Sequence, residues 1–123
     1  MLARRKIAEF LEGFCEHLDR VGYLNVMNIE KNRKGLLDLG ITKKHRETVI
    51  RSLTPEDYCE GPILSKKGKG EAWVFGKEFE GREIYIKLQL VETDAPICWS
   101  FHVAEYRLDY PMRQPLKKRS PKG

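Results

Sequence analysis

The sequence predicts an α+β fold, in which N-terminal helices pack on a small curved antiparallel β-sheet. Two observations support this prediction: apolar residues recur with helical spacing in the first half of the chain, and they alternate with polar residues from residue 71 onward. The chain of 123 residues is long enough for one domain, which we expect to span residues 1–113. No apolar run approaches the roughly 20 residues of a membrane helix, so we expect a cytoplasmic protein with no membrane contact.

The helices are predicted from apolar stripes and from the residues that end them. Residues 4–21 carry a stripe with the i, i+3, i+4, i+7 spacing, and Gly22 ends this helix. An extended piece around residues 24–27 leads to a short helix, "EKNRKGLLDL", which stops at Gly40. Thr42 is the expected N-cap of the next helix, and Thr54 and Pro55 open one further turn that the Gly and Pro at 61 and 62 close.

Three strand-like runs follow, over residues 71–79, 82–91 and 97–106, after a loop "SKKGKG" at residues 65–70. The connection "ETDA" has a common hairpin length, and it pairs Val91 with Pro96. One face of this hairpin is then apolar, with Leu88 opposite Trp99. The opposite face carries three pairs of polar or small residues. These are Tyr85 with His102, Lys87 with Ser100, and Gln89 with Cys98.

The first strand is placed by a two-residue turn at Glu80 and Gly81. This turn puts Gly76 opposite Tyr85 and leaves open space beside the tyrosine. A shift by one residue would exchange the two faces of that strand.

The polar face of the hairpin contains the groups that metal-independent RNA cleavage requires. Such cleavage needs a base for the 2′-hydroxyl, a cation or strong donor for the charge on the phosphorane, and an acid for the leaving 5′-oxygen. Histidine is the residue type here whose ordinary pKa lies near neutrality, so His102 is the candidate base. Lys87 supplies charge, and Tyr85 can hold phosphate or stack on a base. From composition alone, an inert solvent-facing strand is the commoner interpretation.

Other features of the sequence exclude several kinds of site. Three cysteines at residues 15, 59 and 98 define neither a disulfide framework nor a CxxC metal site, and no carboxylate cluster for magnesium accompanies the polar face, so we expect no metal and no cofactor. His17 and His45 lie among charges and are expected on the surface. The net charge is +5, and residues 114–123 hold four of the basic side chains. We expect this segment to be a flexible tail, or alternatively to attract phosphate without reading sequence.

Three stretches carry a resemblance to a known family. "LLDLGITKKHRETVIRSLTPEDYCEGP", "EAWVFGKEFEGREIYIKLQL" and "CWSFHVAEYRLDYP" together resemble the MqsR family of toxins from bacterial toxin-antitoxin pairs, over roughly residues 30–111. The resemblance implies a RelE-like ribonuclease, an mRNA interferase that inhibits translation and growth. It also implies two partners, the mRNA substrate and a cognate antitoxin that binds DNA and is encoded by the adjacent gene.

The resemblance assigns the family's catalytic tyrosine to Tyr85 and the lysine that follows it to Lys87. His102 stands where the best-known form of the family has a lysine, and Cys59 and Glu60 stand where another lysine is implicated. Tyr85, Lys87 and His102 are therefore the expected catalytic residues. The expected RNA-binding residues are Lys66, Lys67, Lys69, Lys77, Gln89 and Ser100, with the four lysines as candidates for the missing cation. The alternative is a noncatalytic module that binds RNA or a protein partner through the same face.

Overall fold

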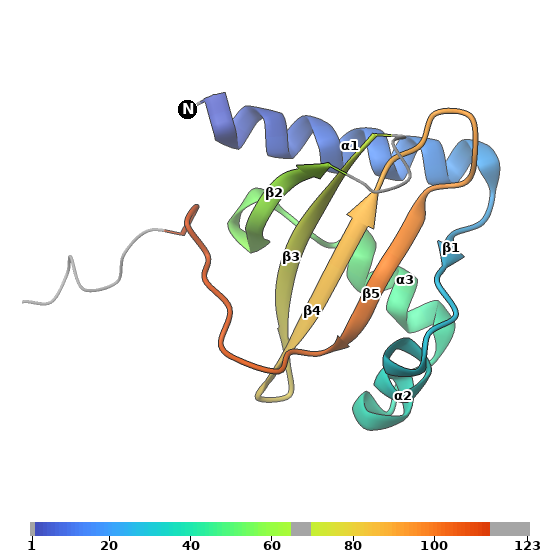
Figure 1. The fold of residues 1–123 in the computed structure, drawn as a ribbon, viewed down its shortest axis with the longest axis vertical. Coiled ribbons are helices and arrows are strands. Elements are labelled where there is room, and N and C mark those ends of the chain that lie inside the picture. Colours follow the sequence, from blue (N-terminus) through green and yellow to red (C-terminus); the bar gives the residue numbers. More distant parts are fainter. Residues whose placement is uncertain (1, 65–69, 114–123) are drawn as a thin grey trace, which may run out of the picture.

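The computed structural model describes residues 2–64 and 70–113, and Figure 1 shows how their helices and strands are arranged. In chain order these are α1 (Leu2–Val21), β1 (Asn25–Val26), α2 (Glu30–Leu39), α3 (Lys43–Arg51), the 3-10 turn η1 (Pro55–Asp57), β2 (Tyr58–Leu64), β3 (Glu71–Phe79), β4 (Arg82–Gln89) and β5 (Ile97–Val103). The α+β prediction is confirmed. The predicted tail at 114–123 and most of the "SKKGKG" loop lie outside the described residues.

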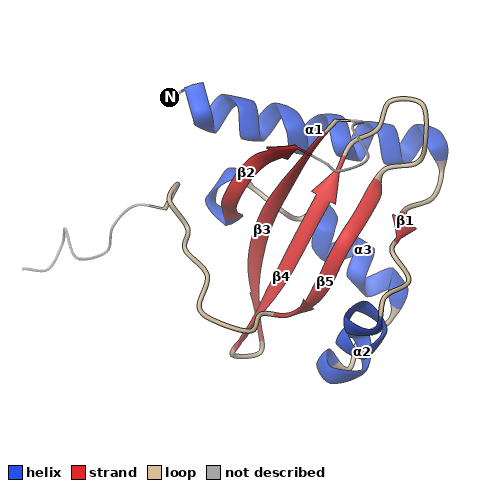
Figure 2. Cartoon of the chain, viewed as in Figure 1, coloured by secondary structure: helices blue, strands red, loops and turns tan. Residues whose placement is uncertain are grey.

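The strands form one sheet in the order β1-β5-β4-β3-β2, drawn in red in Figure 2. The predicted antiparallel sheet is only part of it, because β1 pairs with β5 in parallel. The expected extended piece forms β1. The run that follows η1 forms β2 rather than a closing turn, with Tyr58 opposite Phe75. A strand with two register shifts and a proline has no clean alternation, which explains why the sequence pattern did not reveal it.

The helix ends follow the predicted signals. Gly22 and Gly40 have positive φ angles of 94° and 68°, which glycine adopts without steric cost. The Thr42 hydroxyl accepts a hydrogen bond from the His45 N–H at 3.0 Å, as an N-cap does. None of the described helices is both long and apolar enough to cross a membrane.

The predicted registers hold near the candidate site and fail beyond it. Gly76 lies opposite Tyr85, and Tyr85 lies opposite His102, as expected. After the pair of Lys87 with Ser100, however, Leu88 pairs with Cys98 instead of Trp99. Trp99 is therefore the extra residue of a β-bulge, which a periodic pattern cannot reveal.

The core lies between one face of the sheet and the helices α1 and α3. The strands contribute residues such as Phe75, Ile86 and Phe101, which pack with Phe14 of α1 and Ile50 of α3. All five side chains are buried. The opposite face of the sheet, which carries Tyr85 and His102, is free of α1 and α3 and is available for a site.

The segment of residues 104–113 covers part of this second face. It is tied to Glu83 of β4, whose carboxylate accepts from the Leu108 N–H at 3.0 Å and from the Tyr110 hydroxyl at 2.9 Å. A Cβ on Gly76 would lie 2.6 Å from the Leu108 side chain. The space predicted to be open beside Tyr85 is therefore filled, since only a glycine admits this segment.

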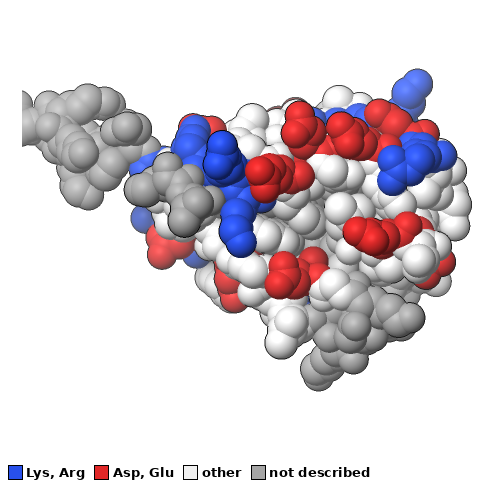
Figure 3. Space-filling view, turned by 90° about the horizontal axis from the view of Figure 1, so that it is seen from above, with Lys and Arg blue, Asp and Glu red and all other residues white. Residues whose placement is uncertain are grey.

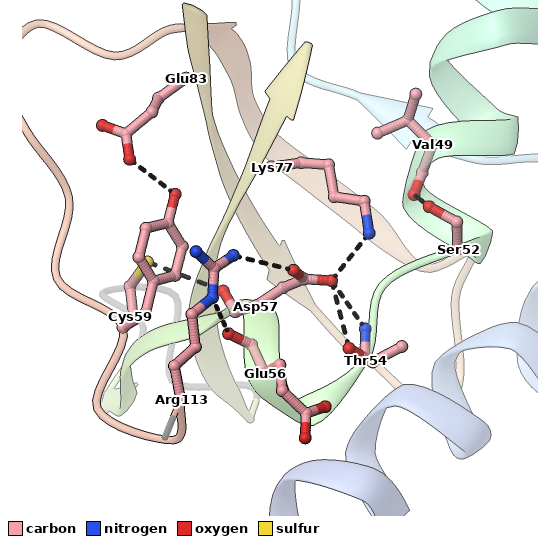
Figure 4. A network of polar contacts seen from close by, with 10 residues as sticks. Val49, Ser52, Thr54, Glu56, Asp57, Cys59, Lys77, Glu83 and Arg113 are labelled. Atoms are coloured by element: carbon pink, nitrogen blue, oxygen red, sulfur yellow. Dashed lines mark hydrogen bonds and ion pairs between the residues drawn. The ribbon is translucent and has the colours of Figure 1, made fainter. Parts of the chain in front are cut away.

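The end of the segment is held by a buried carboxylate, shown in Figure 4. Asp57 accepts from the Thr54 N–H at 3.0 Å, from Lys77 Nζ at 3.1 Å and from Arg113 Nη2 at 3.4 Å. The Arg113 guanidinium also lies 3.7 Å from the centre of the Tyr110 ring. Two cations and a backbone donor compensate the burial of one carboxylate, so the network can fix the segment against η1 and β3.

Candidate active site

A pocket of about 270 Å³ opens on the face of the sheet that carries Tyr85 and His102. Four parts of the chain line it: the beginning of α2, strand β4, strand β5 and the segment after β5. The lining residues are Ile29, Lys31, Tyr85, Ser100, His102, Glu105, Tyr106 and Leu108. Its volume lies just below the roughly 300–1,000 Å³ of ordinary ligand pockets, which suits one nucleotide-sized group rather than a large ligand.

Tyr85 and His102 form the floor of this pocket. They are cross-strand partners whose rings stack with centroids 5.5 Å apart and planes 17° apart. Burial raises the pKa of Tyr85, and the neighbouring Glu60 carboxylate raises it further. The phenol therefore keeps its proton at neutral pH and acts as a donor.

The tautomer of His102 follows from its hydrogen bond. Its Nδ1 lies 3.1 Å from the Val103 carbonyl oxygen. A carbonyl can only accept, so Nδ1 carries the proton in the neutral ring and Nε2 keeps its lone pair. No described residue forms a hydrogen bond with Nε2, so this nitrogen can accept a proton from a bound ligand.

Helix α2 reaches the pocket because two residues hold it tightly against β5. A Cβ on Gly35 would lie 2.6 Å from the Phe101 carbonyl oxygen, so no larger side chain fits there. Asn32 donates to the carbonyls of Met27 and Trp99 at 2.9 and 3.0 Å and accepts from the Phe101 N–H at 2.8 Å. Beyond the end of β1, the Asn32 side chain thus satisfies backbone groups of β5 that a neighbouring strand would otherwise pair with. These groups belong to Trp99 and Phe101, so the contact also fixes the bulge next to Ser100.

Lys31 is the cation that lines the pocket, and the sequence reasoning missed it. Its Nζ pairs with Glu105 Oε2 at 2.8 Å, across the pocket from α2 to the segment after β5. Both side chains are more than half exposed, so the pair is weak and a phosphate can compete for the lysine. The hydrogen bond from Lys31 lowers the pKa of Glu105.

The predicted companions of Tyr85 and His102 have different outcomes. Ser100 lines the same pocket. Lys87 lies opposite Ser100 on this face and is half-buried, but it does not line the pocket. The structure corrects the expectation for Gln89: it is 1% exposed, and its Oε1 accepts from Trp99 Nε1 at 2.7 Å. A buried amide with such a partner has no surface to offer to RNA.

Of the four lysines predicted to supply the missing cation, the structure describes Lys77. Lys77 lies in β3 opposite Ile84, on the core side of the sheet, and it pairs with Asp57. The expectation that Lys77 holds RNA beside Tyr85 is therefore corrected, because one residue of alternation places it on the other face. The predicted RNA-binding residues Lys66, Lys67 and Lys69 lie outside the described residues.

One further expectation concerned the other two histidines. His17 is buried rather than on the surface, with Nε2 2.6 Å from the Asp94 carbonyl oxygen and Nδ1 2.7 Å from Arg20 Nη2. His45 is exposed as predicted. Burial raises the pKa of Cys59 to about 12, and the Glu83 carboxylate adds to this effect. Cys59 is thus a neutral thiol and not a thiolate nucleophile.

Charge is unevenly distributed around the molecule. Figure 3 views it from above, where basic side chains gather at the left, the side on which α1 begins in Figure 1, and again at the upper right, with acidic side chains between and below these two groups. The first turns of α1 supply Arg4, Arg5 and Lys6. Within residues 2–64 and 70–113, no group of three or more His, Cys, Asp or Glu side chains is placed to hold a metal ion.

Comparisons with known proteins return no relative. No family model matches the chain, and no curated protein or solved structure is significantly similar to it.

Proposed function

We propose that the protein is a metal-independent endoribonuclease of RelE-like fold, which cleaves single-stranded mRNA in the pocket of Tyr85 and His102. The observation that carries the proposal is the pairing of a protonated phenol with an imidazole whose Nε2 has no hydrogen-bond partner among the described residues, beside the ammonium of Lys31. These are the three kinds of group that 2′-hydroxyl attack on phosphorus requires. The resemblance in sequence to MqsR toxins also favours this face of the sheet as the catalytic site.

The reaction assigns one step to each group. His102 Nε2 takes the proton of the 2′-hydroxyl while the 2′-oxygen forms a bond to phosphorus. The ammonium of Lys31 offsets the negative charge on the phosphorane, once Glu105 releases it. As the bond from phosphorus to the 5′-oxygen breaks, that oxygen takes the proton of Tyr85. Solvent then accepts the proton that His102 took and returns one to Tyr85, so both residues regain their starting state. The products are a 2′,3′-cyclic phosphate and a free 5′-hydroxyl.

Tyr106 supplies a place for a base. It lines the pocket and is 74% exposed, which is unusual for an aromatic side chain. An exposed ring at the rim of such a pocket can stack on an unpaired base, as in other single-strand RNA sites. The preference for single-stranded RNA follows from this stacking.

The experiment compares cleavage of a labelled single-stranded RNA by the wild type and by four variants in the presence of EDTA. We expect His102→Ala and Tyr85→Phe each to lower the rate about 10²-fold or more, the scale of a lost proton-transfer group. Lys31→Ala should lower it more than Lys87→Ala, because only Lys31 lines the pocket. Mass spectrometry should find cyclic phosphate ends.

His45→Ala is the matched control, since His45 is an exposed histidine of α3 that does not line the pocket and whose ring contacts Phe79 instead. It should cleave at the wild-type rate. An absolute requirement for magnesium, or unchanged cleavage by His102→Ala, would refute the mechanism. The toxin role is tested separately: expression of the chain should arrest growth, and expression of the neighbouring gene as antitoxin should relieve the arrest.

The ion pair between Lys31 and Glu105 favours one alternative, a noncatalytic module that binds RNA or a protein. In that module the lysine would serve only to hold a partner. Retained RNA binding by wild-type protein, with no cleavage under any condition, would identify it.

A further inference from the structure

A second pocket, of about 360 Å³, lies on the other side of α2, between this helix, β1 and the beginning of α3. Its apolar walls come from Val26, Met27 and Leu36. Its polar lining consists of Asn28, Asn32, Arg33, Lys43 and Arg46. Three of these side chains are cationic, and none of the described residues that line the pocket is acidic.

Arg46 is the unusual member of this lining. It is 8% exposed, and its Nε is buried without a hydrogen-bond partner. No carboxylate in the described parts of the chain forms an ion pair with its guanidinium, whereas the buried carboxylate of Asp57 pairs with Lys77 and Arg113. Burying a charge without compensation is costly, so an arginine in this state indicates an absent anion.

The charge of Arg46 is felt inside the protein as well as in the pocket. Burial raises the pKa of the Cys98 thiol, and the positive charge of Arg46 opposes that rise. The Arg46 side chain is itself almost entirely buried, so an anion beside it would gain more than at the surface.

The other cations are placed to complete the site. Lys43 is the first residue of α3, a nine-residue helix, where unpaired backbone N–H groups favour an anion. Arg33 donates from Nη1 to Asn28 Oδ1 at 2.7 Å, and its distance to Glu30 is 3.8 Å. The guanidinium is thus held at the rim by Asn28 and forms a weak, exposed ion pair with Glu30.

We propose that this pocket binds a phosphate group carried on a small apolar or planar body, such as a nucleoside. Two guanidinium groups and a lysine match the charge and the oxygen geometry of a phosphate better than those of a single carboxylate. The apolar walls suit the attached body. The phosphate can belong to a free nucleotide or to an RNA strand. The inference does not rest on cleavage at Tyr85 and His102.

The test measures binding of inorganic phosphate, AMP and a 2′-O-methyl RNA hexamer by calorimetry at constant ionic strength, with acetate as the comparison anion. We expect phosphate and AMP to bind and acetate to bind at least about tenfold more weakly. Arg46→Met and Lys43→Ala should each weaken AMP binding by about tenfold or more, the scale of a lost charge-assisted hydrogen bond. Tighter binding of the hexamer than of AMP assigns the phosphate to a strand, and the reverse assigns it to a free nucleotide.

Two controls keep the result specific. Lys44→Ala removes an exposed charge from the same turn of α3 without touching the pocket, and it should bind AMP like the wild type. If Arg46→Met does not fold, Lys43→Ala and Arg33→Ala decide the question. Amide NMR shifts should change at residues 28, 33, 43 and 46. Shifts confined to residues 85, 100 and 102, or equal binding of acetate and phosphate, would overturn the proposal.

Discussion

Replacing Asn32 with alanine is the sharpest test of how the site is built. The side chain is 1% exposed and makes three hydrogen bonds, two to carbonyls and one from the Phe101 N–H. Alanine fills none of these roles. It leaves the two carbonyls and the amide N–H without their present partner, in a part of the fold where water has little access.

The expected magnitude follows from those three bonds. Each contributes a net 0.5 to 1.5 kcal/mol, about 1 kcal/mol on average, so their loss should cost about 3 kcal/mol of unfolding free energy. For a domain of this size, that corresponds to a drop in Tm of roughly 10 °C. Because Trp99 and Phe101 flank Ser100, RNA cleavage should also fall in the fraction that stays folded.

Urea unfolding followed by circular dichroism measures the change, and Asn28→Ala is the matched control. Asn28 is exposed, and its side chain accepts one hydrogen bond, from Arg33. Its replacement should cost no more than about 0.5 kcal/mol, as is usual for surface positions. A cost below about 1 kcal/mol for Asn32→Ala, with an unchanged urea slope, would refute the role given to this amide.

Three further predictions follow from particular contacts. Glu105→Gln should release Lys31 and lower the KM for RNA several-fold, as kinetics would measure. Gly35→Ala should lower the free energy of unfolding by about 1–3 kcal/mol and reduce cleavage, because its Cβ would lie 2.6 Å from the Phe101 carbonyl oxygen. Burial raises the pKa of Cys98 from 9.0 to about 12, so the folded state keeps a proton that the unfolded state loses. The contribution of this thiol to the free energy of unfolding is therefore complete below about pH 9 and is lost as pH rises toward 12, at up to about 1.4 kcal/mol per pH unit. Cys98→Ala should flatten this decrease in a series of unfolding measurements between about pH 9 and 12.

Each of these predictions has a control in the same chain. Glu12→Gln removes an exposed acid from α1 and should leave the KM unchanged. Gly13→Ala adds a Cβ 3.5 Å from Leu90, which is ordinary contact, and it should be neutral or stabilising in its helix. Cys15→Ala should change the alkaline slope less than Cys98→Ala, because Cys15 is only half-buried. The argument for Glu105 fails if Glu105→Gln leaves the KM unchanged. The argument for Gly35 fails if Gly35→Ala leaves the free energy of unfolding unchanged, and the argument for Cys98 fails if the two cysteine variants have equal alkaline slopes.

The sequence by itself determined the elements whose signals are local. Gly22 and Gly40 end helices because glycine adopts a positive φ, and Thr42 begins one because its hydroxyl accepts from a backbone N–H three residues later. Residue type and spacing are therefore enough to predict these helix boundaries. The pairing of Tyr85 with His102 also followed from the sequence, because alternation and a short connection fix a hairpin register over a few residues.

The tertiary structure decided everything that depends on contacts between distant segments. Lys31 enters the pocket only because Asn32 and Gly35 fit α2 against β5. The hydrogen bond that the Phe101 N–H donates to Asn32 joins residues 69 positions apart in the chain. No local pattern encodes that fit. Gln89 is buried and accepts a hydrogen bond from Trp99, the extra residue of the bulge, and the segment after β5 fills the space over Gly76. Sequence periodicity reports which side of an element is apolar, and packing alone decides which polar groups then meet.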